Sequence, residues 1–180
     1  MKKILWLVSS LTIIAAVCAS TLAYINVITK APIAEMKVKQ ASDAAKAVMP
    51  KGVVKVDKAS LDAQEFYVGK DETGKVLAYA LKGSDNGGYG GLIELMIGFS
   101  PDGKIVTYKA LQSSETPGLG TKLSSAEFSS QFSGKFASKS LKVTKDGGEI
   151  EAITSATITS RAVCRAISSA AEKLERIKGK

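Results

Sequence analysis

The chain has 180 residues, a net charge of +8 and no histidine. This length predicts one domain with one accessory element. Without histidine, Ser-His-Asp and Cys-His nucleophile systems and histidine-based metal sites are excluded, and we expect no metal site. The basic excess is spread along the chain rather than gathered in a basic helix, so a mixed-charge surface is expected and nucleic-acid binding is not.

The two cysteines, Cys18 and Cys164, lie far apart, and neither belongs to a Cys-x-x-Cys pair. Cys18 falls in an apolar run and Cys164 in an expected helix, so we predict small buried side chains rather than a disulfide or a redox pair. A lipid anchor on Cys18 is disfavoured, because the preceding Val17 is larger than the residue usual at that position.

The N-terminal segment from Ile4 to Thr29 contains no charged residue. A membrane-spanning helix needs about 20 apolar residues, so this segment is long enough to span a bilayer. Lys2 and Lys3 precede it, and the positive-inside rule predicts that they stay in the cytoplasm. The alternative is a signal peptide that is cleaved after Ala23.

These features predict a division into three parts. Residues 1–30 form a cytoplasmic tip and a transmembrane helix, and residues 31–50 form a helical stalk or first helix between Pro32 and Pro50. Residues 51–180 then form a domain outside the cytoplasm.

The domain itself alternates short β-rich runs with turn signals. Pro101-Asp102-Gly103 is a turn signal between two of these runs, and the spacings favour antiparallel hairpins over βαβ units. The predicted fold class is therefore α+β, a mostly antiparallel sheet with packed helices. The five main runs are Val53–Val56, Glu65–Val68, Val76–Lys82, Leu92–Phe99 and Ile105–Leu111.

Four further elements are expected after the sheet. A capping box with Ser124 as N-cap starts a short helix, and Leu141–Val143 and Glu149–Ile153 are predicted to be two more strands. An apolar stripe from Val163 to Ile177 predicts a C-terminal helix over Thr159–Lys178 that packs on the core.

Two glycine-rich segments, 87–91 and 115–122, match neither a P-loop nor a Rossmann fingerprint. Each is explained by a tight turn, or by a loop whose backbone amides approach a flat or anionic ligand. Glu115 and Lys122 bracket the second segment and would supply polar anchors.

The segment from Glu151 to Ser160 is rich in hydroxyl groups and lies where a strand is expected to pass into the final helix. Such a row can cap the helix, hold a phosphate, or become phosphorylated or flavinylated.

The order of these segments carries a resemblance to a known family. Glu-Thr-Pro-Gly-Leu-Gly at 115–120 is followed by Thr-Ser-Ala-Thr-Ile-Thr-Ser at 154–160, and Tyr-Gly-Gly-Leu-Ile stands at 89–93. Together they resemble the covalent-FMN domain family, which includes the G subunit of the Rnf electron-transport complex and the C subunit of the sodium-pumping NADH:quinone oxidoreductase. The compact length is more similar to the Rnf G subunit.

The resemblance implies that Thr157 forms a phosphoester with FMN. Two residues depart from the family pattern, because Ser155 stands where glycine is usual and Glu151 where aspartate is usual. The remaining cofactor-binding residues that the resemblance implies are Glu115, Thr116, Gly118, Leu119, Gly120 and Lys122 in the first motif and Thr154, Ser155, Ala156, Thr159 and Ser160 in the second.

The resemblance also implies a function. The chain would be an electron-carrying subunit, not an enzyme alone, of a membrane-bound ferredoxin:NAD oxidoreductase complex that couples electron transfer to translocation of Na⁺ or H⁺. Implied partners are the other Rnf subunits, among them a membrane subunit with its own covalent flavin, and a flavin transferase. The implied location is the inner membrane, crossed once. The alternatives are a flavoprotein like the C subunit of the sodium pump, or a non-redox membrane-anchored binding module.

Overall fold

The computed structural model describes residues 2–61, 64–115, 120–137 and 141–179. The chain divides into two compact units, Met1–Gln40 and Ala41–Lys180, which are treated separately below.

Helix α1 (Lys2–Ala47) begins in the first unit and is continuous past Pro32, so the helical segments expected on either side of Lys30 form one helix. Its N-terminal part is apolar and long enough to cross a membrane. The hydroxyls within this part donate back to carbonyls three or four residues earlier, as Ser9 does to Leu5 at 2.9 Å and Thr21 to Val17 at 2.8 Å. The polar atoms that dilute the apolar run are thereby hydrogen-bonded within the helix.

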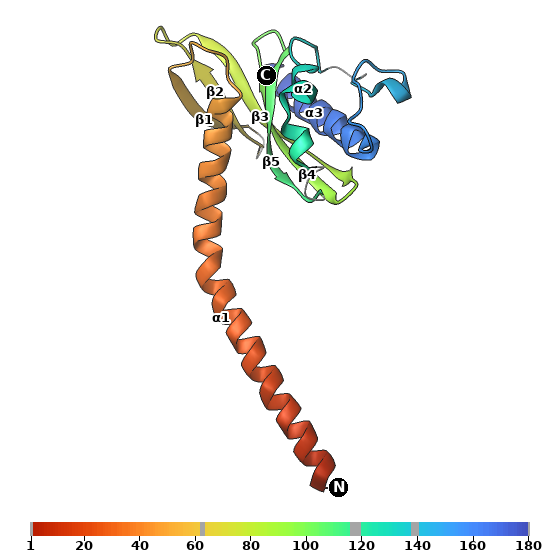
Figure 1. Ribbon diagram of the computed structural model, residues 1–180. Coiled ribbons are helices and arrows are strands. Elements are labelled where there is room, and N and C mark those ends of the chain that lie inside the picture. Colours follow the sequence, from red (N-terminus) through yellow and green to blue (C-terminus); the bar gives the residue numbers. More distant parts are fainter. Residues whose placement is uncertain (1, 62–63, 116–119, 138–140, 180) are drawn as a thin grey trace. The chain divides into compact units, whose positions relative to one another are not determined.

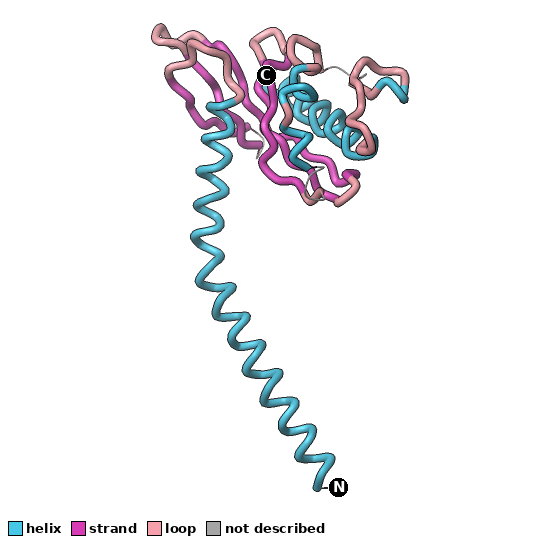
Figure 2. Tube along the Cα trace, viewed as in Figure 1, coloured by secondary structure: helices cyan, strands magenta, loops and turns pink. Residues whose placement is uncertain are grey.

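The second unit is built on a five-stranded antiparallel sheet in the order β1-β2-β3-β4-β5 (Figures 1 and 2). This confirms the α+β prediction, and each strand overlaps one of the five predicted runs. The strands are β1 (Lys55–Leu61), β2 (Gln64–Lys70), β3 (Val76–Gly88), β4 (Gly91–Phe99) and β5 (Ile105–Ser113). The β4–β5 turn forms where predicted, with Gly103 at a φ of +92°.

Two glycines allow helices to approach the sheet closely. A Cβ on Gly83 of β3 would lie 2.0 Å from the carbonyl oxygen of Ala166 in α3 (Thr157–Lys178), and one on Gly98 of β4 would lie 2.0 Å from that of Val48. The main core lies between α3 and the sheet, and a smaller core joins the end of α1 to Tyr67, Ala80 and Met96. Figure 1 shows α3 crossing the sheet.

The short helix α2 (Ala126–Ser130) begins one residue later than predicted. Its N-cap is Ser125, whose hydroxyl accepts a hydrogen bond from the Phe128 amide at 3.3 Å. The predicted N-cap, Ser124, instead ends the 3-10 helix η1 (Gly120–Ser124). The capping-box prediction was therefore wrong by one position.

The two strands predicted at 141–143 and 149–153 do not form within the described residues. Among the described residues, a single parallel bridge between Val143 and Ile150 joins the two segments, around the 3-10 helix η2 (Thr144–Asp146). Gly147 takes a left-handed φ of 78°, and the Gly148 amide donates to the Val143 carbonyl, so the chain turns before a ladder can extend. Figure 2 shows this region mostly as loop.

Candidate functional site

The hydroxyl-rich segment 151–160, called the hydroxyl row below, runs into the first turn of α3. The helix begins at Thr157, two residues earlier than predicted. Its N-cap is Ala156, whose methyl side chain cannot accept a hydrogen bond from the first amides. The amides of the first turn of a helix have no intrahelical partner and carry the positive end of its dipole. Thr157, which is half-buried, therefore lies at a helix start suited to an anion.

Ser155 adopts a φ of +64°, in the left-handed region that glycine occupies without strain. Thr154, Ser155 and Ala156 form the turn that leads into Thr157. The residue that departs from the family's usual glycine therefore stands at a position whose backbone favours glycine.

Ser160 fixes this turn from inside the protein. Its hydroxyl donates to the Ala156 carbonyl and accepts from the Ile153 amide, both at 3.0 Å, and its side chain is fully buried. The hydroxyl proton of Ser160 is thus already donated within the protein. The role of this side chain is to hold the turn that precedes Thr157.

Thr159 lies beside it but differs in bonding. Its side chain is 1% exposed, and its hydroxyl has no hydrogen-bond partner among the described residues. A buried hydroxyl left unpaired costs about 1–3 kcal/mol. Such an atom at the start of α3 indicates a place where a further polar group belongs.

Positive charge reaches Thr157 from a segment that the sequence did not single out. Lys145, in η2, brings its ammonium nitrogen to 3.4 Å from the Thr157 hydroxyl oxygen. Arg161, the nearest arginine in sequence, is paired instead with Asp146 through two hydrogen bonds of 2.7 Å, and this pairing lowers the pKa of Asp146. Lys145 stands in an ordinary Lys-Asp-Gly-Gly turn, so no sequence signal marked it.

The two glycine-rich segments meet at Glu115. The Gly90 amide donates to one carboxylate oxygen of Glu115 at 3.3 Å, while the other oxygen is buried without a partner among the described residues. A Cβ on Gly88 would lie 2.7 Å from the bonded oxygen, and one on Gly90 would lie 2.0 Å from the Ser114 carbonyl. Glycine is thus required for this contact.

The rest of the second segment is described only in part. Thr116, Gly118 and Leu119 lie outside the described residues, Gly120 opens η1, and the Lys122 side chain is exposed.

A pocket of about 290 Å³ joins the two motifs. Lys122, at the end of the first motif, and Thr154, at the start of the second, both line it. Gln131 closes one side by accepting from the Glu151 amide at 2.7 Å and donating to its carbonyl at 3.3 Å. The structure therefore brings Lys122 and Thr154 to one pocket, although neither Glu115 nor Thr157 is among its lining residues.

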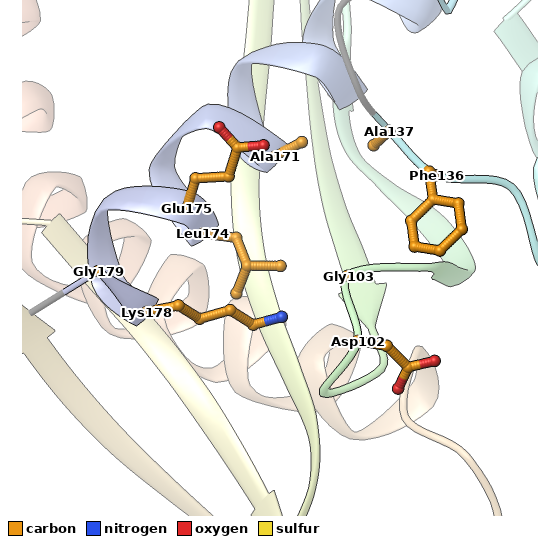
Figure 3. Close-up of a pocket in the computed structure, with 9 residues that line it drawn as sticks. All are labelled: Asp102, Gly103, Phe136, Ala137, Ala171, Leu174, Glu175, Lys178 and Gly179. Carbon is orange, nitrogen blue, oxygen red and sulfur yellow. The ribbon is translucent and has the colours of Figure 1, made fainter.

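A second pocket, of about 400 Å³, lies at the other end of α3 (Figure 3). Leu174 and Phe136 face it from opposite sides, and the Asp102–Gly103 turn closes its edge. Leu174 is roughly 25 Å along the helix from Thr157 at about 1.5 Å per residue, so this pocket is separate from the hydroxyl row.

Comparison with protein families places the same segments in a known domain. Residues 88–172 match the FMN-binding domain, a range that includes the Gly88–Gly91 turn, Glu115 and the hydroxyl row. The fold also resembles the crystal structure of NqrC from Shewanella oneidensis, with a TM-score of 0.50 and 20% identity over 69% of this chain and 72% of that one. At this identity the likeness establishes the fold alone.

Three relatives match most of the chain along most of their own length. The chain is 38% identical to the G subunit of the Na⁺-translocating ferredoxin:NAD⁺ oxidoreductase complex of Acetobacterium woodii over 85% of this chain and 83% of the relative. It is 32% identical to the G subunit of the ion-translocating oxidoreductase complex of Methanosarcina acetivorans over 95% and 94%. It is also 32% identical to the G subunit of the proton-translocating ferredoxin:NAD⁺ oxidoreductase complex of Clostridium ljungdahlii over 99% and 95%. The resemblance seen in the motifs is confirmed, and the chain belongs to the family of G subunits of ion-translocating oxidoreductase complexes, with their FMN-binding domain.

Proposed function

We propose that this chain is the electron-carrying subunit of a membrane-bound, Rnf-type ferredoxin:NAD oxidoreductase complex, and that it carries FMN as a phosphoester on Thr157. Membership in the family of G subunits supports the first part. The observation that carries the second is the placement of Thr157 at the uncapped start of α3, with the Lys145 ammonium 3.4 Å from its hydroxyl.

The residues present fit this cofactor. A phosphate on Thr157 would meet free amides at the helix start and the positive charge of Lys145. The unpaired Thr159 hydroxyl and the unpaired oxygen of Glu115 are buried polar atoms that a polar ligand can satisfy. Gly88 and Gly90 let the backbone of the 87–91 turn pack directly against Ser114 and Glu115.

Attachment is a condensation at Thr157. The Thr157 oxygen would form a bond to the phosphorus of an activated flavin phosphate while the bond from that phosphorus to its activating group breaks. The activating group and the hydroxyl proton leave, so the product carries the mass of FMN less one water. A flavin transferase must provide an activated flavin phosphate for this reaction. Ser160 holds the 153–156 turn through its two hydrogen bonds, which keeps Thr157 at the surface of the helix start.

Bound FMN supplies one- and two-electron redox chemistry. Glu115, which is 9% exposed, would accept a hydrogen bond from an N–H or O–H group of the cofactor through its unpaired oxygen. Phe128, Ala152 and Ile153 give the 290 Å³ pocket an apolar lining, while Lys122 and Thr154 give it polar groups. This combination suits a flat ring system with polar edges.

The membrane anchor fits the same proposal. Residues 1–30 would span the membrane once with Lys2 and Lys3 in the cytoplasm, residues 31–50 would form the stalk, and residues 51–180 would lie outside the cytoplasm at the inner membrane. Covalent attachment keeps a cofactor in place on a side of the membrane where free FMN is scarce. Partners would be the other Rnf subunits, including a membrane subunit with its own covalent flavin.

The C subunit of a sodium-pumping NADH:quinone oxidoreductase is the second candidate. The likeness to NqrC supports it at the level of fold only. Sequence identity of 38% over most of the chain favours the G subunit of an Rnf-type complex.

The proposal is tested with the full-length chain, expressed together with a flavin transferase and examined on a denaturing gel under ultraviolet light. We expect a fluorescent band from the unmodified sequence and from Thr73→Ala, a threonine of the β2–β3 turn outside both motifs, and no fluorescence from Thr157→Ala. A dark band from the unmodified sequence, or a fluorescent one from Thr157→Ala, would contradict the assignment.

A further inference from the structure

An ion pair outside both family motifs joins α3 to the glycine turn between β3 and β4. Arg165 of α3 donates to both carboxylate oxygens of Asp85, from Nε at 2.9 Å and from Nη2 at 2.8 Å. Two parallel bonds of this kind fix direction as well as distance, because the guanidinium is planar and rigid. The pair therefore holds the end of β3 against the helix that carries Thr157.

The same two side chains also bind the turn itself. The Gly87 amide donates to Asp85 Oδ1 at 2.8 Å, and Arg165 Nη2 donates to the Gly87 carbonyl at 3.3 Å. A Cβ on Gly87 would lie 2.4 Å from Arg165 Nη2, so the contact needs glycine or a displaced guanidinium. Both polar groups of Gly87 are thus held by the pair.

The Asp85 side chain is 19% exposed, whereas Arg165 is 50% exposed. The hydrogen bonds from Arg165 lower the pKa of Asp85, against the opposing effect of burial. Asp85 is therefore ionised at neutral pH, and the bonds to Arg165 and Gly87 are charge-assisted.

The position of the 87–91 turn determines where the Glu115 carboxylate lies. Gly88 packs against one oxygen of Glu115, and the Gly90 amide donates to the same oxygen. This leaves the other oxygen buried, with no partner among the described residues. A continuous path of contacts thus runs from Arg165 through Asp85 and the turn to Glu115.

We infer that the Asp85–Arg165 pair is a positioning device for the flavin site, which orients the 87–91 turn and through it the carboxylate of Glu115. The inference rests on the proposed function, because it assigns the unpaired oxygen of Glu115 to the flavin. Asp85 and Arg165 act through Glu115 and do not themselves touch the cofactor. Loss of the pair loosens the turn and changes the electrostatic environment that Glu115 provides.

The first measurement is hydrogen exchange of the full-length chain in detergent, followed by mass spectrometry. Asp85→Asn and Arg165→Lys each keep a polar side chain but lose the charged two-bond pairing. We expect exchange in the 86–91 segment to accelerate about fivefold or more in both variants, because charge-assisted bonds to Gly87 are lost. Glu65→Gln is the control, since it removes the surface pair between Lys58 and Glu65, at 2.6 Å, from the β1–β2 hairpin.

The second measurement is the flavin reduction potential of the same full-length proteins. We expect Asp85→Asn to shift the potential, and we expect this shift to vanish when Glu115→Gln is already present. Unchanged exchange in the 86–91 segment would overturn the inference, as would a potential shift of equal size with and without Glu115→Gln.

The two proposals fail in different ways. A wild-type chain without flavin refutes the proposed function and with it the role of the pair at a flavin, whatever the exchange rates show. If the chain carries flavin but Asp85→Asn changes neither the exchange of the 86–91 segment nor the reduction potential, the inference is refuted and the proposed function is not.

Discussion

Ser155 shows how one residue can carry a cost at the site. Within the described residues it is the only non-glycine residue with a positive φ. For an L-residue this conformation costs about 1–2 kcal/mol, and the turn is held in it by the hydrogen bonds of Ser160 on either side. The strain lies two residues before Thr157, in the turn that presents it.

Ser155→Gly is expected to stabilise the domain. Relief of the strained φ outweighs the added freedom of glycine in the unfolded chain, for a net gain of about 0.5–1 kcal/mol in the free energy of unfolding. Urea denaturation followed by circular dichroism measures this change. Ser155→Ala, which keeps the strain, should give no gain, and an equal gain from both variants would contradict the explanation.

Gly90 tests the contact between the 87–91 turn and Ser114. A methyl group there would lie 2.0 Å from the Ser114 carbonyl oxygen, so Gly90→Ala should lower the free energy of unfolding by about 1–3 kcal/mol. The matched control is Gly179→Ala, whose Cβ would lie 3.3 Å from the nearest atom. Thermal unfolding of both variants provides the comparison, and equal stability would show that the turn can move away from Ser114.

At the level of residues, the sequence predicts a role for Thr157 because its neighbours form a recognisable order of hydroxyl and small side chains, and that role stays a prediction. It could not identify Lys145, because the approach of this lysine to Thr157 depends on the fold of a loop between two distant segments. It also could not separate Ser160, whose hydroxyl is bonded inside the protein, from Thr159, whose hydroxyl has no partner among the described residues.

At the level of elements, α3 packs its apolar face into the core and carries Thr157 at its first position. Ile167 is fully buried against the sheet, while Ile158, in the first turn, is 48% exposed. The apolar stripe predicted from the sequence matches the buried face, since Val163, Ile167, Ala170 and Leu174 are all buried. The stripe determines which way Thr157 faces.

Ile167→Ala should lower the free energy of unfolding by about 2–5 kcal/mol through lost contacts and a cavity. Ile158→Ala, the same change on the exposed face of the same helix, should alter it by less than about 0.5 kcal/mol. Guanidinium denaturation distinguishes them, and similar losses would mean that α3 does not pack as described.

Cys164 makes the stability of this helix sensitive to high pH. Burial raises the pKa of its thiol to about 12 from an ordinary value near 9.0. A raised folded-state pKa means that the unfolded chain loses this proton first, so the thiol's contribution to stability is complete below pH 9.0 and is lost as the pH rises toward 12.

Cys164→Ala should therefore reduce the fall in stability over this alkaline range. Tyr108, whose pKa is raised by burial and then by the neighbouring Cys164, remains in the variant, so the difference between the two pH profiles reports the thiol together with its effect on Tyr108. Urea midpoints measured from about pH 8 to pH 11, on either side of the ordinary thiol pKa, provide the test, and parallel profiles would contradict it.

The sheet was predictable because its strands alternate with strong turn signals such as Pro101-Asp102-Gly103. The segment 141–153 was not, because its short apolar runs have the composition of strands. Whether such runs pair depends on the turn between them, and Gly147 and Gly148 direct that turn into a 3-10 helix. The error of one residue at the N-cap of α2 has a similar origin, since Ser124 and Ser125 are chemically equivalent caps.

At the scale of the whole molecule, one chain combines an apolar helical segment with a separate compact domain. In the proposed function the first holds the second at the membrane surface. The apolar part of α1 needs no polar partner for its hydroxyls, because they bond back to its own carbonyls.

A charge in the middle of this segment should weaken membrane insertion. Ile14→Arg places a guanidinium near the centre of the expected span, at a cost of about 2.5–3.5 kcal/mol, so less protein should remain in carbonate-washed membranes. Met36→Arg, on the same helix beyond the span, should have no such effect. Equal retention of both variants would argue against a span at Ile4–Thr29.

Attachment of FMN to Thr157 through its phosphate is tested most directly by the mass of the intact chain. The full-length chain is expressed with a flavin transferase, weighed, and then fragmented to locate any added group. We expect an added mass equal to FMN less one water, located on Thr157 and absent from Thr157→Ala. An unmodified mass, or the same addition at another residue, would contradict the assignment of Thr157.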